Sequence, residues 1–525
     1  MALLAGCGGG SGGDESTRTE ISTNAMSFSA AAPDAPTPAS QTFTATFGTD
    51  IAHLSVIHSG AAVANVTSTM NGRTASITVE PVAPDSVGPG TYVGAVAVTG
   101  YTCADPTCSR LSAGTTSTVS IGYQVSPVVQ LVTPYVATAG VSDEVVIRGI
   151  GLASFEVTGV RFGDTAATVS TPVSPTEIRA THPALAAGIY TVRIVASNHQ
   201  GEIPSTASLI VVDPTAYAAA TLPYLTAPSA VRRLIYDAER RALLVVTDAG
   251  SGSIARYAYT GTAWDAPTEV DAGLRDVALS AKGTSLYGIN STAFLPVDPV
   301  TLAAGTAVTA PSLTTDAFLK NIVVGNDDVG LVTTGINAST ATSVYLYSSL
   351  GNSLIQTGSA LNNATPAMSA NGAGAYLIQG DPTLTSDVPV QRYVTAGNAL
   401  SNSTISLRQN TVPPAVSRTV NRLVLNGLRV YDGSEALLGT LPDTTAAVVL
   451  KPDGTRAYTY DPTAGGIVAY DISVDRDEAA YEALGAAVPL AGDPGSGVRM
   501  TISPDGGTLF LAGSTQIVVQ PTPAL

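Results

Sequence analysis

The sequence predicts an all-β protein of several domains. Short segments of alternating apolar and polar residues run through most of the chain between Gly, Pro and Asn turns, and a period of two residues is typical of strands. The 525 residues include 51 Gly and 33 Pro, a composition that favours tight turns over helices. A unit of roughly 40–50 residues recurs in the C-terminal part, as in repeat architectures. The chain is too long for a single core, so we expect about three or four domains.

The charge balance restricts the class of partner. Charged residues make up 12% of the chain, about half of the usual ~25%. The 24 basic and 40 acidic residues give a net charge of −16. A nucleic-acid-binding surface needs Lys and Arg to neutralise phosphates, so we expect no nucleic-acid partner.

Residues 1–19 are expected to hold a membrane anchor and a flexible tether. Leu4-Ala5-Gly6-Cys7 resembles the lipobox of bacterial lipoproteins, and the Gly-rich run 8–13 resembles the tether that follows it. The resemblance implies a lipid on Cys7, and a protein held in the cell envelope at the outer membrane or cell surface. Only six residues precede Cys7, fewer than a signal peptide needs, so we expect the natural start to lie upstream. No run of about 20 apolar residues follows, so attachment would be through acyl chains alone.

Residues 20–127 are predicted to form an Ig-like β-sandwich, because six or seven short alternating strands fit into this length. Cys103 and Cys108 lie on either side of the turn Asp105-Pro106, close enough in sequence for their Cα atoms to reach disulfide distance. No second Cys or His pair completes a zinc site. We therefore predict a hairpin disulfide formed in an oxidising compartment. The alternatives are two free thiols or half of a metal site.

Residues 128–214 resemble the IPT/TIG domain, which is also an Ig-like sandwich. The resemblance rests on Pro134, Gly149-Ile150-Gly151, the strand from Val160 to Gly163, and the segment from Pro183 to Tyr190. Gly149 and Gly151 are expected to form a turn with positive φ. The family occurs in DNA-binding factors, receptors and bacterial surface proteins. In an acidic, exported chain we expect a spacer or interaction module.

Residues 215–525 are predicted to form a β-propeller, for which we prefer seven blades to the alternatives of six or eight. Most units contain a turn such as Pro-Asp-Gly between apolar runs, and they span residues 233–259, 274–298, 319–347, 364–394, 415–432, 447–471 and 498–520. The last unit lacks a good outer strand, whereas a spare one lies at 219–225. We predict that this spare strand pairs with the last blade and closes the ring, which removes free sheet edges. The last two units resemble the YVTN family of propellers through Pro452-Asp453-Gly454 and Ser503-Pro504-Asp505-Gly506.

Residues that could carry chemistry are few in the propeller. From Thr215 onward there is no His and no Cys, which removes His- and Cys-based catalysis and the usual zinc ligands. Arg275 and Asp276 stand at the start of a predicted innermost strand, so they are candidate contacts for a ligand in the central channel. The alternative for them is a structural pair. The acidic cluster Asp471, Asp475, Asp477, Glu478 and Glu482 lacks the spacing of a calcium loop, so we prefer a solvated loop to a calcium site. We predict no catalytic residue, no metal ligand and no cofactor.

Two functions follow from this reading. The first is a non-catalytic envelope lipoprotein whose propeller, displayed on Ig-like modules, binds a protein or glycan. The second is a carboxylate- or calcium-dependent propeller enzyme, such as a lactonase, lyase or glycosidase, acting in the central channel. Three or more converging Asp, Glu or Asn side chains at the channel mouth would favour the enzyme. A mouth lined with Thr, Ala and Val would favour binding.

Overall fold

The computed structural model describes residues 18–523, with gaps at 153–155, 198–202, 204, 311–312, 314–316, 337–341, 349–352, 361–362, 381–385, 408–411 and 427. Within these residues the chain is all-β, with strands β1 to β45 and one single-turn helix, α1 (Pro84–Val87). Cys7 and the Gly-rich run 8–13 lie outside the described residues, so lipidation stays a prediction. In the described part, no helix is long and apolar enough to cross a membrane.

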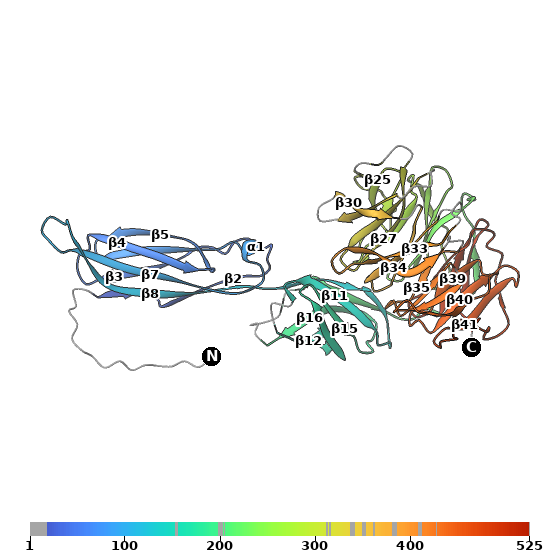
Figure 1. Cartoon of the computed structure of the whole chain (residues 1–525), viewed down its shortest axis with the longest axis horizontal. Helices are drawn as coiled ribbons and strands as arrows, with labels where there is room; N and C mark the ends of the chain where they lie inside the picture. The colour runs from blue at the N-terminus through green and yellow to red at the C-terminus, as the bar shows by residue number, and fades with distance from the viewer. Residues whose placement is uncertain are drawn as a thin grey trace.

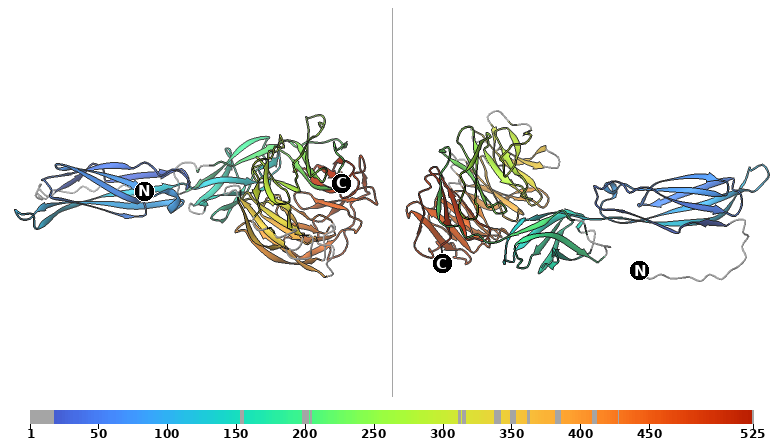
Figure 2. Two further views of the ribbon diagram at one scale, coloured as in Figure 1. Left: turned by 90° about the horizontal axis from the view of Figure 1, so that it is seen from above. Right: turned by 180° about the vertical axis from the view of Figure 1, so that it is seen from behind.

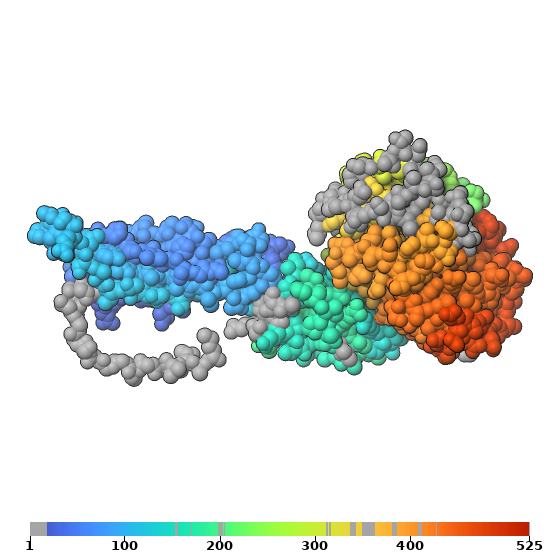
Figure 3. Space-filling model, in the orientation of Figure 1, coloured from blue at the N-terminus to red at the C-terminus, as the bar shows by residue number. Residues whose placement is uncertain are grey.

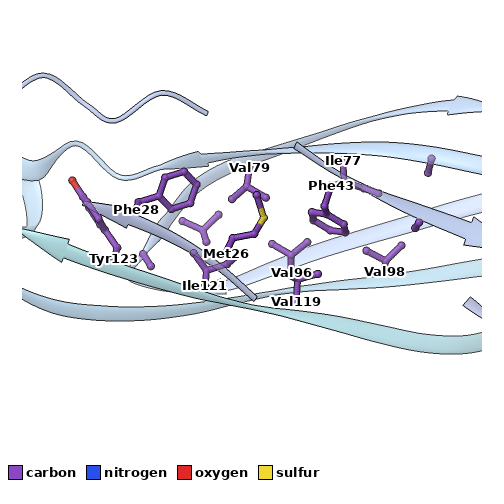
Figure 4. Packing of buried hydrophobic residues seen from close by; sticks show 14 of the residues in the cluster. Met26, Phe28, Phe43, Ile77, Val79, Val96, Val98, Val119, Ile121 and Tyr123 are labelled. Atoms are coloured by element: carbon purple, nitrogen blue, oxygen red, sulfur yellow. The ribbon is translucent and has the colours of Figure 1, made fainter. Parts of the chain in front are cut away.

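The first domain is a sandwich of two four-stranded sheets (Figure 4). One sheet has the order β1 (Thr19–Ile21), β3 (Gln41–Phe47), β6 (Thr74–Pro81) and β5 (Val63–Asn71). The other has the order β2 (Ala25–Ala30), β8 (Leu111–Val125), β7 (Gly90–Cys103) and β4 (His53–Gly60). Phe43, Val96 and Tyr123 are buried between the sheets. The alternation in sequence is therefore the alternation between this core and solvent.

The disulfide predicted for this domain is confirmed. Cys103 ends β7 and Cys108 lies in the tip of the long β7–β8 hairpin, with Cα atoms 4.7 Å apart. Asp105 shapes the tip by accepting hydrogen bonds from the hydroxyls of Thr107 and Ser109 at 2.7 and 2.8 Å. These bonds, the one from Thr107 first, lower the pKa of Asp105 to about 2. The hairpin tip is thus closed covalently and kept negatively charged.

The second domain is also a two-sheet sandwich. One sheet has the order β10 (Val136–Thr138), β17 (Ser208–Val212), β16 (Gly188–Ala196), β12 (Val157–Phe162) and β13 (Thr165–Ala166). The other has the order β14 (Val169–Ser174), β15 (Glu177–Thr181), β11 (Glu144–Ile150) and β9 (Val128–Thr133). The two sheets bury one apolar cluster that includes Ile147, Phe162 and Leu209.

The two glycines predicted to share a turn here have different roles. Gly151 has φ +72° and lies against Pro89 of the first domain. Gly149 instead lies within β11, where the register with β9 shifts. A Cβ at Gly149 would be 2.0 Å from the carbonyl oxygen of Val128, so close backbone approach, and not positive φ, requires glycine there. The prediction was wrong for Gly149 because the constraint comes from pairing with a distant strand.

The remaining described strands form seven four-stranded antiparallel sheets that follow one another along the chain. The first sheet contains β19 (Val231–Asp237), β20 (Ala242–Thr247), β21 (Ser253–Ala258) and β22 (Thr268–Asp271). The second contains β23 (Asp276–Leu279), β24 (Leu286–Ile289), β25 (Ala293–Val297) and β26 (Val308–Thr309). The third contains β27 (Ala317–Val324), β28 (Val329–Ile336), β29 (Thr342–Ser348) and β30 (Ser353–Ala360). The fourth contains β31 (Thr365–Met368), β32 (Gly374–Ile378), β33 (Val388–Val394) and β34 (Ala399–Leu407). The fifth contains β35 (Ala415–Val416), β36 (Arg422–Leu425), β37 (Arg429–Asp432) and β38 (Leu437–Thr440). The sixth is β39 (Ala447–Leu450), β40 (Arg456–Asp461), β41 (Gly466–Asp471) and β42 (Val488–Pro489), and the last is β43 (Arg499–Ile502), β44 (Thr508–Ala512), β45 (Ile517–Pro521) and β18 (Ala220–Leu222).

These sheets form a closed ring. The first strand of each sheet contacts the first strand of the next, and β43 contacts β19. The spare strand β18 pairs with β45, with Thr221 opposite Val518, which confirms the predicted closing strand. Apolar clusters fill the spaces between neighbouring sheets, and the one at the closure joins Leu234 of β19 to Phe510 of β44. Closure thus gives the last sheet four strands, like each of the other six.

The second domain packs against one face of the ring, at the hairpin turns that follow the innermost strands. Tyr135, between β9 and β10, lies against Gly283, where an added Cβ would be 2.0 Å from the tyrosine ring. Arg418 forms an ion pair with Asp143 of the second domain. Residues 134–136 also line a cavity of about 300 Å³ at the ring axis. We call this side of the ring the docked face.

The three domains are arranged in line. Figures 1 and 2 show the first sandwich at one end, the second in the middle and the ring at the other end. Figure 3 shows the described surface of the second sandwich in direct contact with the ring, whereas the first sandwich projects away from it. The ring is therefore held by its docked face at the end of an extended stalk.

Candidate functional site at the mouth of the ring

The candidate site is a cavity along the ring axis that runs from the face opposite the docked one toward the docked face, where it shares Tyr236, Met368 and Val416 with the cavity described above. It has a volume of about 550 Å³ and is lined by residues of all seven innermost strands, from β19 to β43. We call it the mouth cavity. Its size is in the range of small-molecule sites, and no described residue of the second domain lines it.

Basic side chains line one half of the mouth cavity. Arg232 and Arg233 come from β19, Lys320 from β27 and Arg499 from β43. No acidic residue is among the described residues that line it. The cavity lining is therefore positively charged, although the whole chain has a net charge of −16.

Two of these cations, Arg232 and Lys320, lie at β-bulges. The register of β19 against β20 shifts between Val231 and Arg233, which leaves Arg232 unpaired in the ladder. The register of β27 against β28 shifts between Leu319 and Asn321, which leaves Lys320 unpaired in the same way. A bulge turns a side chain away from the regular alternation and is common beside functional sites.

Each of three cations is held by one backbone carbonyl of a neighbouring sheet. Arg232 Nη1 donates to Leu274 O at 2.8 Å, and Lys320 Nζ donates to Asn363 O at 2.5 Å. Arg499 Nε donates to Val231 O at 3.2 Å. Within the described part of the chain, none of the three pairs with a carboxylate. Their positive charges are therefore held in place without a direct ion pair, and the carboxylates of Asp276 and Asp248 act on Arg499 and Arg232 only from beyond ion-pair distance.

The crowding of like charges changes the pKa of these groups. Burial, and next the charge of Arg499, lower the pKa of the Lys320 ammonium to about 8. Burial and the charge of Arg233 lower the pKa of Arg499 as well. Lys320 is thus charged at neutral pH but loses its proton in mildly alkaline solution.

We expect the free energy of unfolding to depend on the protonation of Lys320. The ordinary pKa of Lys320 is 10.5 and its folded value is about 8. Between these pH values the unfolded chain binds more protons, so the free energy of unfolding should rise with pH. The Tm of the wild type, relative to Lys320→Met, should therefore increase from pH about 7 to about 10. Parallel Tm profiles would contradict this, and Lys282→Met, at an exposed lysine, serves as the control.

The two residues predicted to contact a channel ligand do not line the mouth cavity. Asp276 is only 1% exposed and pairs with Arg233 through both carboxylate oxygens, at 2.6 and 2.5 Å. Arg275 points the other way, with its guanidinium 4.1 Å from the ring of Phe318 and its Nε bonded to Ser291. Neither side chain reaches the cavity, because successive strand residues face opposite sides and the partner of Asp276 lies 43 residues away.

The acidic cluster after β41 is a loop with local hydrogen bonds. Asp471 accepts from the backbone and hydroxyl of Ser473, and Arg476 pairs with Glu482 at 3.5 Å. The described residues contain no group of three or more His, Cys, Asp or Glu that could hold a metal ion. The cluster therefore shows the short-range contacts of a solvated loop.

A second concavity adjoins the mouth cavity on the same face. It has a volume of about 1080 Å³ and shares Pro413 and Arg499 with the mouth cavity. Tyr460, Leu490 and Pro494 supply apolar surface there. A ligand larger than the mouth cavity could therefore continue over the fifth, sixth and seventh sheets.

Comparison with known proteins identifies one domain. Residues 127–209 match the model of the IPT/TIG domain. This segment is an IPT/TIG domain. The match confirms the resemblance carried by residues 128–214 of the sequence. No curated protein matches the chain.

Several solved structures resemble the chain, and they have propeller-like folds. Hydrazine synthase of Kuenenia stuttgartiensis shares 13% identity, with a TM-score of 0.44, over 57% of this chain and 97% of its own. An auxiliary nutrient binding protein from Bacteroides ovatus shares 12% identity, with a TM-score of 0.37, over 76% of this chain and 98% of its own. A luciferin-regenerating enzyme shares 11% identity, with a TM-score of 0.37, over 58% and 96%. At these values the likenesses support no inference about activity.

Proposed function

We propose that the protein is a lipid-anchored protein of the cell envelope whose ring, a seven-bladed YVTN-like propeller, binds a protein or glycan without converting it. Cys7 would carry the lipid at the outer membrane or cell surface, and the two sandwiches would hold the ring away from the membrane. The observation that supports this most is the position of the mouth cavity. The IPT/TIG domain occupies the docked face, which leaves the cavity open to a partner on the other side.

The lining of the mouth cavity also supports binding. Thr365, Ala367 and Val448 are among its neutral residues. Acid–base hydrolysis by carboxylates needs at least two acidic side chains around the scissile bond, and the described lining contains none. The cavity therefore offers contacts and charge without a carboxylate pair.

One observation favours an enzymatic alternative of the lyase type. A lysine with a pKa near 8 can act as a general base close to neutral pH. Lys320 could remove a proton next to a carboxylate whose charge Arg499 stabilises, and the electron pair would expel the group on the adjacent carbon. This alternative predicts an unsaturated product, which binding alone does not form.

The anchor is tested by labelling. Cells that express the full gene and are fed labelled palmitate should incorporate the label into the wild-type protein but not into Cys7→Ala. Cys103→Ser is the matched cysteine control and should be labelled normally. Label that persists in Cys7→Ala would contradict the anchor and leave the binding activity to be judged separately.

The ring is tested by blocking the mouth cavity. Ala367→Trp places a large side chain in the cavity, whereas Thr268→Trp places one on the exposed outer strand β22. The full chain should retain a component of envelope protein or glycan fractions, and Ala367→Trp should reduce this retention at least about tenfold, or roughly 1.4 kcal/mol. Retention that survives Ala367→Trp would place the binding surface elsewhere. A retained component released in altered covalent form would favour the lyase.

A further inference from the structure

The cations of the mouth cavity have donors that the fold does not use. Arg232, Lys320 and Arg499 each form one hydrogen bond to a backbone carbonyl. A guanidinium has five N–H groups and an ammonium has three. Fastening neighbouring sheets therefore accounts for one donor of each residue, and all three residues line the cavity.

The arrangement opposes folding stability. Lys320 is half-buried, and burial together with the nearby charge of Arg499 lowers its pKa. A buried charge is normally paired, because removing it from water is costly. Three cations that share a cavity without a carboxylate among its described lining are therefore better explained by an anion that binds there.

The opposite half of the cavity is apolar. Pro366 and Met368 of the fourth sheet, Pro413 and Pro414 before the fifth and Val448 of the sixth line it. A ligand in the cavity would thus meet donors on one side and carbon atoms on the other. A free inorganic anion would contact only the basic half of the cavity.

We propose that the mouth cavity binds a small organic polyanion, a molecule with two or more carboxylate, sulfate or phosphate groups, through Arg232, Lys320 and Arg499. The proposal rests on the proposed binding function and assigns its ligand class. Anionic groups bind the three cations, and the carbon skeleton packs on the apolar half. Among the protein and glycan partners proposed above, an acidic saccharide best combines these features.

Calorimetric titration of the full chain tests this with three probes. Digalacturonate is an acidic saccharide, citrate is a polyanion without a sugar, and maltose is a neutral saccharide of similar size. Digalacturonate should bind at least about tenfold more tightly than maltose, and added salt should weaken it. Citrate as tight as digalacturonate would show that charge suffices, and this supports the polyanion class while overturning the preference for a saccharide.

Variants locate the site. Arg232→Gln, Lys320→Met and Arg499→Gln should each weaken digalacturonate at least about tenfold, because a hydrogen bond to a charged group is lost. Lys320→Arg keeps the charge and should retain most of the affinity. Arg429→Gln is the matched control, because Arg429 lies on the exposed start of β37 in the fifth sheet of the ring and outside the cavity lining. Thermal unfolding of each variant separates loss of the fold from loss of the site.

The outcomes also separate this proposal from the proposed function. If neither anion binds, or if maltose binds as tightly, the polyanion proposal is wrong. Retention of an envelope component that Ala367→Trp abolishes would then still support the ring as a binding platform. Losses of equal size in Arg429→Gln and Arg499→Gln would overturn the assignment to the mouth cavity.

Discussion

Replacement of Asp276 with Ala should lower the free energy of unfolding by about 3 kcal/mol, because it leaves the half-buried guanidinium of Arg233 without its partner. Asp276 accepts two hydrogen bonds from Arg233 of β19 and one from the backbone of Ile322 in β27, at 2.9 Å. One carboxylate thus ties three consecutive sheets together at the ring axis. Urea unfolding followed by circular dichroism measures the loss.

Two controls give this result its meaning. Asp271→Ala removes an exposed carboxylate that accepts from Ser251, and such surface changes usually stay within about 0.5 kcal/mol. The double variant Asp276→Leu with Arg233→Met removes both charges and should recover most of the loss. A loss in Asp276→Ala no larger than that in Asp271→Ala would show that the buried pair does not stabilise the ring.

The repeat architecture could be read from sequence because its signals are local. Gly454 and Gly506 have φ of +73° in the Pro-Asp-Gly turns, a conformation that favours glycine. The closing strand was predictable for a similar reason, since the last unit lacked an outer strand and 219–225 supplied one. Turn chemistry and strand period are set within a few residues, so one sequence suffices to find them.

The functional face could not be predicted in the same way. Arg232 and Lys320 reach the axis through bulges that depend on pairing with β20 and β28. A signal was nevertheless present, because basic residues are few in this chain and three innermost strands carry at least one each. Arg275 and Asp276 have a similar position in sequence but lie outside the lining, since their orientation is set by Arg233 and Phe318.

Replacement of Gly283 with Ala should separate the IPT/TIG domain from the ring. Gly283 has φ +68°, and a Cβ there would be 2.0 Å from the ring of Tyr135. Gly506 has the same place in another turn with φ +73°, but its Cβ would be 3.2 Å from the nearest atom, in Lys451. Both substitutions cost about 1–2 kcal/mol of backbone strain, and only Gly283→Ala adds a steric clash of about 1–3 kcal/mol.

Undocking relieves that clash, so Gly283→Ala should change the arrangement of the domains as well as the stability of the protein. Small-angle scattering should show a larger radius of gyration for Gly283→Ala than for Gly506→Ala, and proteolysis near Asp213-Pro214 should become faster. Tyr135→Ala removes the group that collides, so in the double variant with Gly283→Ala the extra destabilisation should disappear. Equal behaviour of the two single variants would mean that Tyr135 does not hold the ring.

Binding of digalacturonate at the mouth cavity should persist in the undocked chain, because its lining comes from the innermost strands of the ring and the residues beside them.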